Sequence, residues 1–369
     1  MNRKKVLISM TAHIGDFVWS TSAFAILKKT YPEVEITVIA TKDVKEIAVG
    51  NTVIDDVIFC PYFYPGFKTK IRKLLWMFVS FPKIIFKRFD VCIILDVSRI
   101  ATLLAKIARI PKIVGADIFY AGYNKSYSLS KFYTDKIKLP KNQDTIHTCI
   151  RFQTIIKSFF NIYNNALPVI PDILCDCDNT TKLKNLVKNQ HGLSVALCIR
   201  GSKSSDSFWN KKNFKDIIDK VDRQFQSVCF YIIGTSQDFG YVQSIADKSN
   251  IKNLCGKTSL LELREVLKMM DLLISIDTGV IHVAATTKTH IISLHSSTSW
   301  KQTGPLTHRS SKFHKELDCW PCIFKRTFED FKCTSFPEPK CMQSITVDEV
   351  YREIAKILKK VEPHKLHFT

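Results

Sequence analysis

A short polar stretch at residues 11–16, Thr-Ala-His-Ile-Gly-Asp, stands between an apolar run at 6–10 and helically spaced apolar residues at 17–29. The pattern predicts a strand, a turn and a helix, and ligands of open α/β sheets bind at such turns. Gly15 would let the backbone approach a ligand, and Asp16 could accept the proton of a sugar hydroxyl. The alternative is that Asp16 only caps the helix. A single glycine disfavours a nicotinamide site, which needs Gly-x-Gly-x-x-Gly.

A second turn of this kind lies at residues 275–282, Ser-Ile-Asp-Thr-Gly-Val-Ile-His. Backbone N–H groups at Thr278 and Gly279 would point outward from a helix N-terminus, where the helix dipole favours an anion such as a diphosphate. Asp277 and His282 could hold sugar hydroxyls or order the turn. On the residues alone, a capped strand-to-helix turn without a ligand is the alternative.

Four cysteines near the C-terminus have the spacing Cys-x2-Cys-x10-Cys-x7-Cys; they are Cys319, Cys322, Cys333 and Cys341. Such a set of thiols matches tetrahedral zinc or iron ligation, so we expect a structural metal site that pins a loop. Reduced thiols that bind nothing and disulfides are the alternatives. The other eight of the 12 cysteines are scattered, and we interpret them as small buried hydrophobic residues.

Positive charge gathers in the segment at residues 68–88. The chain has 54 Lys and Arg against 34 Asp and Glu, a net charge of +20, which favours anionic lipid, phosphorylated substrates or nucleic acid as partners. The segment itself combines seven cations, no acid and an apolar stretch at 74–79. This pattern is typical of a helix at a membrane surface. A core helix flanked by solvated lysines is the alternative.

Strands and helices that alternate along the chain must position these residues. Apolar runs at 6–10, 35–40, 56–60, 91–95 and 112–114 predict one parallel sheet, and runs at 194–199, 227–233, 272–276 and 290–294 predict a second. Residues 164–179, with Pro168 and Pro171, predict a linker. We therefore predict an α/β protein of two doubly wound Rossmann-like domains, 1–165 and 166–345, that face a cleft, with a closing helix and tail at 346–369.

Composition narrows the class of protein. With 46% hydrophobic and 24% charged residues, the chain is globular and neither collagen-like, of low complexity nor wholly disordered. It contains no run of 18 uncharged apolar residues, and the apolar run after Lys5 is too short for a signal peptide. We therefore expect a cytoplasmic protein.

The motifs together resemble the ADP-heptose:lipopolysaccharide heptosyltransferase family, glycosyltransferase family 9. The residues that carry the resemblance lie in the same order over nearly the whole chain: 6–29 with His-Ile-Gly-Asp at 13–16, Gly-Lys-Thr-Ser-Leu at 256–260, 271–285 with Asp-Thr-Gly at 277–279, Thr298-Ser299, and Thr-Gly-Pro at 303–305. The resemblance implies a GT-B fold and an inverting transfer from a nucleotide-diphosphate sugar without a catalytic metal. It also implies that Asp16 is the general base and that Asp277, Thr278 and Gly279 contact the donor.

Two departures from the family pattern concern the donor phosphates. The family often has an arginine just after the first strand, where this chain has Met10, and a lysine two residues before a tryptophan, where this chain has Ser207. The phosphates would then need other cations, and we favour Arg200 and Lys203, just past a predicted strand end. Lys211 and Lys212 fit a solvated helix start. The pair Asp176-x-Asp178 imitates the metal motif of another glycosyltransferase fold but lies in the predicted linker, so we discount it.

The resemblance predicts transfer of heptose from ADP-heptose onto the lipopolysaccharide or lipooligosaccharide core, by an enzyme peripheral to the inner face of the inner membrane. The basic excess at residues 1–165, with 25 cations and 12 acids, suits an acceptor side that meets phosphorylated lipid. Another nucleotide sugar, or a protein acceptor as in autotransporter heptosyltransferases, is the alternative chemistry. A basic nucleic-acid-binding protein would also fit the charge, but no nucleic-acid-binding motif accompanies it, so we expect no nucleic acid partner.

Overall fold

The computed structural model divides the chain into two compact units, Met1–Leu174 and Cys175–Thr369. The division falls inside the predicted linker, and the helix at the C-terminal end of the chain is part of the second unit. The structure describes all residues except 1–3, 61–66, 97, 118–129, 141–144, 164–179, 188–191, 202–208, 226, 321, 323–332, 334, 336–338 and 367–369.

The first unit contains a six-stranded parallel sheet in the order β3-β2-β1-β4-β5-β6. Its central strands are apolar and fully buried, because helices cover both faces of a parallel sheet. The strands are β1 (Lys5–Met10), β2 (Glu35–Thr41), β3 (Asp56–Cys60), β4 (Val91–Ile94), β5 (Lys112–Ala116) and β6 (Asp135–Ile137).

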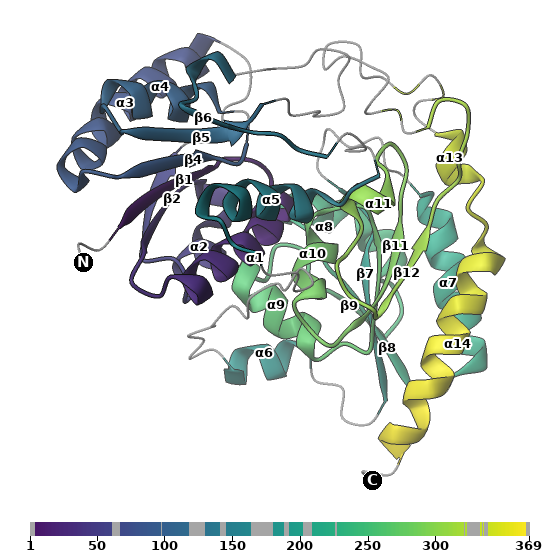
Figure 1. Cartoon of the computed structure of the whole chain (residues 1–369). Helices are drawn as coiled ribbons and strands as arrows, with labels where there is room; N and C mark the ends of the chain where they lie inside the picture. Colours follow the sequence, from purple (N-terminus) through teal and green to yellow (C-terminus); the bar gives the residue numbers. More distant parts are fainter. Residues whose placement is uncertain are drawn as a thin grey trace. The chain divides into compact units, whose positions relative to one another are not determined.

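Two layers of helices sandwich this sheet (Figure 1). On one side α1 packs against α5, and on the other α3 and α4 lie together and bury Trp76, Ile84 and Leu104 against the strands. The helices are α1 (Ile14–Thr30), α2 (Lys45–Val49), α3 (Phe67–Lys87), α4 (Arg99–Ile107) and α5 (Thr148–Phe160), with 3-10 turns at Lys42–Val44 and Ser130–Phe132.

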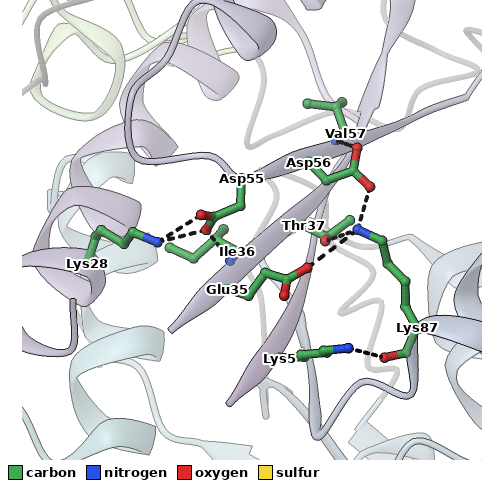
Figure 2. A network of polar contacts seen from close by, with 9 residues as sticks. All are labelled: Lys5, Lys28, Glu35, Ile36, Thr37, Asp55, Asp56, Val57 and Lys87. Atoms are coloured by element: carbon green, nitrogen blue, oxygen red, sulfur yellow. Dashed lines mark hydrogen bonds and ion pairs between the residues drawn. The ribbon is translucent and has the colours of Figure 1, made fainter. Parts of the chain in front are cut away.

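Ion pairs tie two of these helices to the sheet (Figure 2). The ammonium of Lys28 in α1 lies 2.8 Å from the carboxylate of Asp55, which also accepts the backbone N–H of Ile36. Lys87, at the end of α3, lies 2.5 Å from Asp56 and 3.6 Å from Glu35. Lys87 is one of the seven cations of the segment at 68–88 that the sequence assigns to a membrane surface. In the structure it holds α3 to β2 and β3.

The second unit contains another six-stranded parallel sheet, in the order β12-β11-β10-β7-β8-β9. Its strands are β7 (Leu193–Cys198), β8 (Val228–Ile232), β9 (Ile251–Asn253), β10 (Leu272–Ile276), β11 (His290–Leu294) and β12 (Ser310–Phe313). One large core lies between this sheet and the helices α7 (Lys211–Gln224) and α14 (Val347–Leu366), which run side by side in Figure 1.

The remaining helices of the second unit are shorter. A capping box begins α9 (Leu260–Lys268), where the Ser259 hydroxyl accepts the N–H of Glu262 and the Glu262 carboxylate accepts the N–H of Ser259. The others are α6 (Thr180–Leu186), α8 (Phe239–Val242), α10 (Gly279–Ala285), α11 (Trp300–Thr303) and α13 (Lys340–Gln343), with 3-10 turns at Ser236–Asp238 and Gln243–Ile245.

Both sheets therefore have the same doubly wound topology, which confirms the predicted fold class. In each sheet the strand order reverses once, between β1 and β4 and between β7 and β10, and ligands of such sheets bind beside this switch point. The loops that follow these four strands are the places to look for a site. No helix in the described part of the chain is both long and apolar enough to span a bilayer.

Candidate active site at the two switch points

Asp16 lies in the first turn of α1, directly after β1. The helix begins at Ile14, three residues earlier than predicted, so Gly15 and Asp16 are helical and Gly15 makes no special turn. His13 precedes the helix without a capping bond from its side chain, and the Asp16 carboxylate instead accepts the backbone N–H of His13. Asp16 thus caps its helix, as the alternative interpretation held, and remains partly exposed.

Two charged groups distant in sequence act on Asp16. Asp96 follows β4, the strand across the switch point, and Arg151 comes from α5, which packs on α1. Burial and the Asp96 charge raise the pKa of Asp16, while the charges of His13 and Arg151 oppose the rise; the net direction is upward. The Arg151 side chain is itself buried, which lowers its pKa to about 10 against the opposing effect of Asp16.

Asp96 also fixes the turn that carries Asp16. Its carboxylate accepts the Ser9 hydroxyl at 2.9 Å, the Thr11 backbone N–H at 2.6 Å and the Thr11 hydroxyl at 2.5 Å. Charge-assisted bonds of this kind are stronger than neutral ones, so the β1–α1 turn is held at three points. A carboxylate with a raised pKa on a rigid turn suits general-base chemistry.

Sequence reasoning missed both Asp96 and Arg151. Asp96 had a usable signal, since it is the first acidic residue after an apolar strand, the same place as Asp16 and Asp277. The sequence carries no signal for Arg151, because a cation in a helical pattern looks like any solvated cation. Only the packing of α5 on α1 shows that it faces Asp16.

In the second unit, Asp277 follows β10 and is nearly buried. Its carboxylate oxygen Oδ2 lies 3.2 Å from His295 Nδ1 and accepts the hydroxyl of Thr298, and its N–H donates to the Leu294 carbonyl. These partners and the buried His282 outweigh the desolvation of Asp277 and hold its pKa below the ordinary value. Asp277 is therefore an ionised group that joins the ends of β10 and β11.

The turn after Asp277 leads into α10. Thr278 caps this helix, because its hydroxyl accepts the N–H of Val280 at 3.3 Å, and it lies 4.0 Å from the Cys198 sulfur at the end of β7. The capped turn of the alternative interpretation is thus present. Gly279 is the first helical residue.

The cations predicted to meet donor phosphates differ in placement. Arg200 follows β7 on the other side of the switch point; its guanidinium lies 3.5 Å from Asp238 and stacks at 4.6 Å on the ring of Tyr241. Lys211 bonds to the Tyr241 carbonyl and the Ser244 hydroxyl, and Lys212 pairs with Asp216 at 2.7 Å. Lys203 lies outside the described residues, as do Asp176 and Asp178.

Gly256 shows why its motif needs a glycine. Its φ of +73° is unfavourable for other residues, and a Cβ there would lie 2.7 Å from the Cα of Ser236. Its N–H donates to the Gly234 carbonyl at 2.9 Å. The loops after β8 and β9 are therefore packed backbone to backbone beside the Arg200–Asp238 pair.

The four cysteines of the predicted metal site all lie in the described part of the chain. Cys341 is buried, and its pKa is raised by burial and by the charges of Cys333 and Cys319, so both of these thiols lie within electrostatic reach of Cys341. Even so, no group of three or more His, Cys, Asp or Glu among the described residues is arranged to hold a metal ion. The metal site stays a prediction.

The scattered cysteines follow the prediction where they are described. Cys60, Cys92, Cys149, Cys198 and Cys255 are buried and Cys229 is partly buried. Burial raises the pKa of Cys149 and Cys198 to about 11 and that of Cys60 to about 12, which makes them unreactive. Cys175 and Cys177 lie outside the described residues.

Known proteins resemble this chain over its whole fold. The chain is similar to the solved structures of ADP-heptose lipopolysaccharide heptosyltransferase II of E. coli, with 16% identity and a TM-score of 0.74 over 97% of this chain and 99% of the other. It is also similar to a family 9 glycosyl transferase of Veillonella parvula, with 17% identity and a TM-score of 0.78 over 98% of each chain. An iron-containing dodecameric glycosyltransferase of enterotoxigenic E. coli matches at 12% identity and a TM-score of 0.58, over 97% of this chain and 77% of the other.

Curated relatives match a shorter stretch. Lipooligosaccharide heptosyltransferase 2 of Campylobacter jejuni subsp. jejuni serotype O:6 is 30% identical over 108 residues, which are 29% of this chain and 32% of the relative. The match thus spans about a third of that relative's length. The sequence profile described as glycosyltransferase family 9 (heptosyltransferase) matches residues 81–331, more than half of this chain. The chain therefore belongs to glycosyltransferase family 9, the heptosyltransferase family.

Proposed function

We propose that this protein is an inverting glycosyltransferase that transfers heptose from ADP-heptose onto a sugar of the lipopolysaccharide or lipooligosaccharide core. The observation that carries the proposal is Asp16: a partly exposed carboxylate with a raised pKa, on a turn pinned by Asp96 at a switch point. Family membership and the names of the relatives support the donor and acceptor. Another nucleotide sugar or a protein acceptor remains the alternative substrate pair.

In the proposed step, Asp16 removes the proton of an acceptor hydroxyl while the hydroxyl oxygen attacks the anomeric carbon of the donor. A new glycosidic bond forms as the bond from that carbon to the diphosphate oxygen breaks, and the bonding electrons leave with the nucleoside diphosphate. A single displacement inverts the anomeric configuration. Burial and the Asp96 charge raise the pKa of Asp16 while the Arg151 charge opposes the rise, and a carboxylate with a raised pKa is a stronger base.

The second unit supplies the proposed donor contacts. The N–H groups of Thr278 and Gly279, together with Arg200, would stabilise the leaving diphosphate. Asp277 and His282 would order this turn, because the Asp277 carboxylate is already engaged by His295 and Thr298. Lys203 and Gly15 stay candidate contacts, and no step of this scheme uses a metal.

We propose that the enzyme acts in the cytoplasm at an anionic membrane surface, the inner face of the inner membrane. Along α3, one side is buried through Trp76 and Ile84, while the opposite side exposes apolar groups at helical spacing. Leu75, Phe78, Val79 and Phe86 are 59%, 69%, 70% and 82% exposed. The neighbouring α4 adds Leu103 and Ile107, which are 47% and 49% exposed. The same two helices carry the exposed cations Lys83 and Lys106.

Several large apolar side chains exposed on two neighbouring helices are typical of a surface that binds a partner or a membrane. Cations beside it favour an anionic lipid surface, which would take up the apolar side chains and attract the lysines. The core-helix alternative therefore accounts for the inner side of α3 and leaves its outer side unexplained.

A structural zinc or iron at Cys319, Cys322, Cys333 and Cys341 is a further part of the proposal. Four thiols suit either metal, and the Cys333 sulfur accepts the N–H of Ser335 at 3.4 Å, the kind of bond that tunes metal-bound sulfur. The E. coli relative that is described as iron-containing gives a precedent for metal in the fold. The metal would order the loop and take no part in catalysis.

The decisive experiment incubates the protein with a panel of sugar nucleotides, with and without truncated lipopolysaccharide, and follows nucleoside diphosphate release. Asp16→Asn preserves the shape of the side chain but removes the base, so we expect turnover to fall by about 100-fold or more while donor affinity changes little. Near-normal turnover in Asp16→Asn would reduce Asp16 to a helix cap. Ser9→Ala, which removes only one of the bonds to Asp96, is the matched control.

A further inference from the structure

Two tryptophans join the segment after β11 to the segment that leads into the cysteines. The indole N–H of Trp320 donates to the backbone carbonyl of Thr298 at 3.2 Å, and the indole N–H of Trp300 donates to His314 Nε2 at 3.1 Å. The His314 ring lies between them, with ring centroids 5.6 Å from Trp300 and 5.7 Å from Trp320. Each segment thus donates one indole hydrogen bond to the other, and the three rings pack against one another at tilted angles.

Thr298 links this contact to the turn at residues 277–279, called the donor turn below because it carries the proposed donor contacts. Its carbonyl accepts the indole of Trp320 while its hydroxyl donates to the carboxylate of Asp277. The same carboxylate oxygen lies 3.2 Å from His295, whose other ring nitrogen lies 2.9 Å from the Ser293 hydroxyl. A shift of the Thr298 backbone would therefore move the hydroxyl that holds Asp277.

Trp320 follows Cys319 directly and stands inside the Cys-x2-Cys pair. Its backbone is anchored locally, because its N–H donates to the Leu317 carbonyl at 2.7 Å. A change at Cys319, by metal binding or by alkylation, would therefore act on the residue that carries this indole.

We propose that Trp320 is a positioning residue that couples the segment at residues 317–320 to the donor turn through Thr298 and Asp277. The inference rests on the proposed role of that turn in holding the nucleoside diphosphate. It gives the residues just before the Cys-x2-Cys pair a function beyond stability: the contact of Trp320 with Thr298 raises donor affinity. By linkage, a bound nucleoside diphosphate strengthens the contact between Trp320 and Thr298 to the same degree.

The variant that tests this is Trp320→Phe, which keeps an aromatic ring beside His314 and removes the N–H. Trp209→Phe is the matched control, since the buried Trp209 indole donates to a backbone carbonyl of the same unit, that of Ile345, at 2.9 Å. Both variants lose one neutral hydrogen bond, and such a loss corresponds to about a 2- to 10-fold change in an equilibrium constant.

The first readout needs no ligand: amide hydrogen exchange of the peptide that covers residues 272–285, measured by mass spectrometry. We expect faster exchange there in Trp320→Phe and in the wild type after treatment with chelator and N-ethylmaleimide, and no change in Trp209→Phe. Unchanged exchange of this peptide in Trp320→Phe would overturn the proposal.

The second readout is calorimetric titration with ADP. We expect Trp320→Phe to weaken ADP binding by about 2- to 10-fold and to raise the KM for the donor while kcat at saturating donor is retained. Equal ADP affinity in Trp320→Phe and wild type would also count against the proposal. If instead the exchange result holds but the wild type binds none of ADP, UDP and GDP, the coupling stands and the proposed donor role of the turn fails.

Discussion

The exposed side of α3 allows the loss of membrane binding in a variant to be predicted in size. Phe78 and Phe86 are 69% and 82% exposed, so about three quarters of each ring is available for insertion into lipid. Full burial of a Phe side chain is worth about 1.5–3 kcal/mol. The double substitution Phe78→Ser/Phe86→Ser should therefore cost about 3 kcal/mol of membrane binding, a decrease of about 100-fold in the partition coefficient.

The assay is sedimentation with vesicles of anionic lipid at low and at high salt. Because salt screens charges but does not remove apolar insertion, the double Phe variant should bind less at both salt concentrations. Replacing the cations Lys70, Arg72, Lys73 and Lys83 with Gln should weaken binding mainly at low salt, by about 1 kcal/mol per cation at most. Lys87 is left out of this set because it pairs with Asp56 and Glu35.

Tyr163→Ser is the control, since Tyr163 is 90% exposed and follows α5 in the same unit, away from α3 and α4. Thermal unfolding of all variants should stay close to wild type, because none of the substituted rings is buried. If the double Phe variant partitions like Tyr163→Ser at both salt concentrations, the apolar face does not enter lipid and the membrane proposal is wrong.

Further variants test the two sites and the cysteines. Arg151→Met should move the acidic limb of the kcat/KM pH profile to higher pH, because the Arg151 charge opposes the raised pKa of Asp16 and activity needs the carboxylate form; an unmoved limb would exclude Arg151 from this role. Asp277→Asn should lower the melting temperature at neutral pH, and its difference from wild type should shrink as the pH falls below about 4. The sign follows because the folded pKa of Asp277 is depressed, so its stabilisation is present above the unfolded pKa and is lost as pH falls through the folded one. Protein purified without chelator should contain about one zinc or iron per chain, and Cys322→Ser should lower thermal stability; elemental analysis of a fully active, metal-free preparation would contradict the metal site.

Long apolar runs predicted most of the sheet strands and their order along the chain. The strands that sequence reasoning missed are β6, β9 and β12, of three or four residues each, Asp-Lys-Ile, Ile-Lys-Asn and Ser-Ser-Lys-Phe. Each is the outermost strand at one end of its sheet, so it needs no continuous apolar run to be stable there. Their pairing with β5, β8 and β11 decides their conformation, and that pairing is a tertiary contact.

The candidate site was predictable to the extent that it is local. Asp16 and Asp277 each follow an apolar strand, a signal visible over ten residues, whereas Arg151 reaches Asp16 across 135 positions and Thr298 reaches Asp277 across a strand. Lys87 shows a different limit, since a lysine counted among the cations of the membrane-facing segment is paired with two acids of β2 and β3. Charge and spacing alone do not say which partner a long side chain finds.

The short polar strands also affect how the protein behaves at high concentration. An outer strand presents unpaired N–H and C=O groups that could pair with the sheet of another molecule. Lys136 in β6, Lys252 in β9 and Lys312 in β12 each place an ammonium on such a strand, and the brevity of these strands leaves few groups for a foreign strand to bind. Pairing with a foreign strand is therefore disfavoured at these three outer strands, and on the outer strand β3 Asp56 places a charge instead. The two described sheets thus combine apolar centres with charged outer strands.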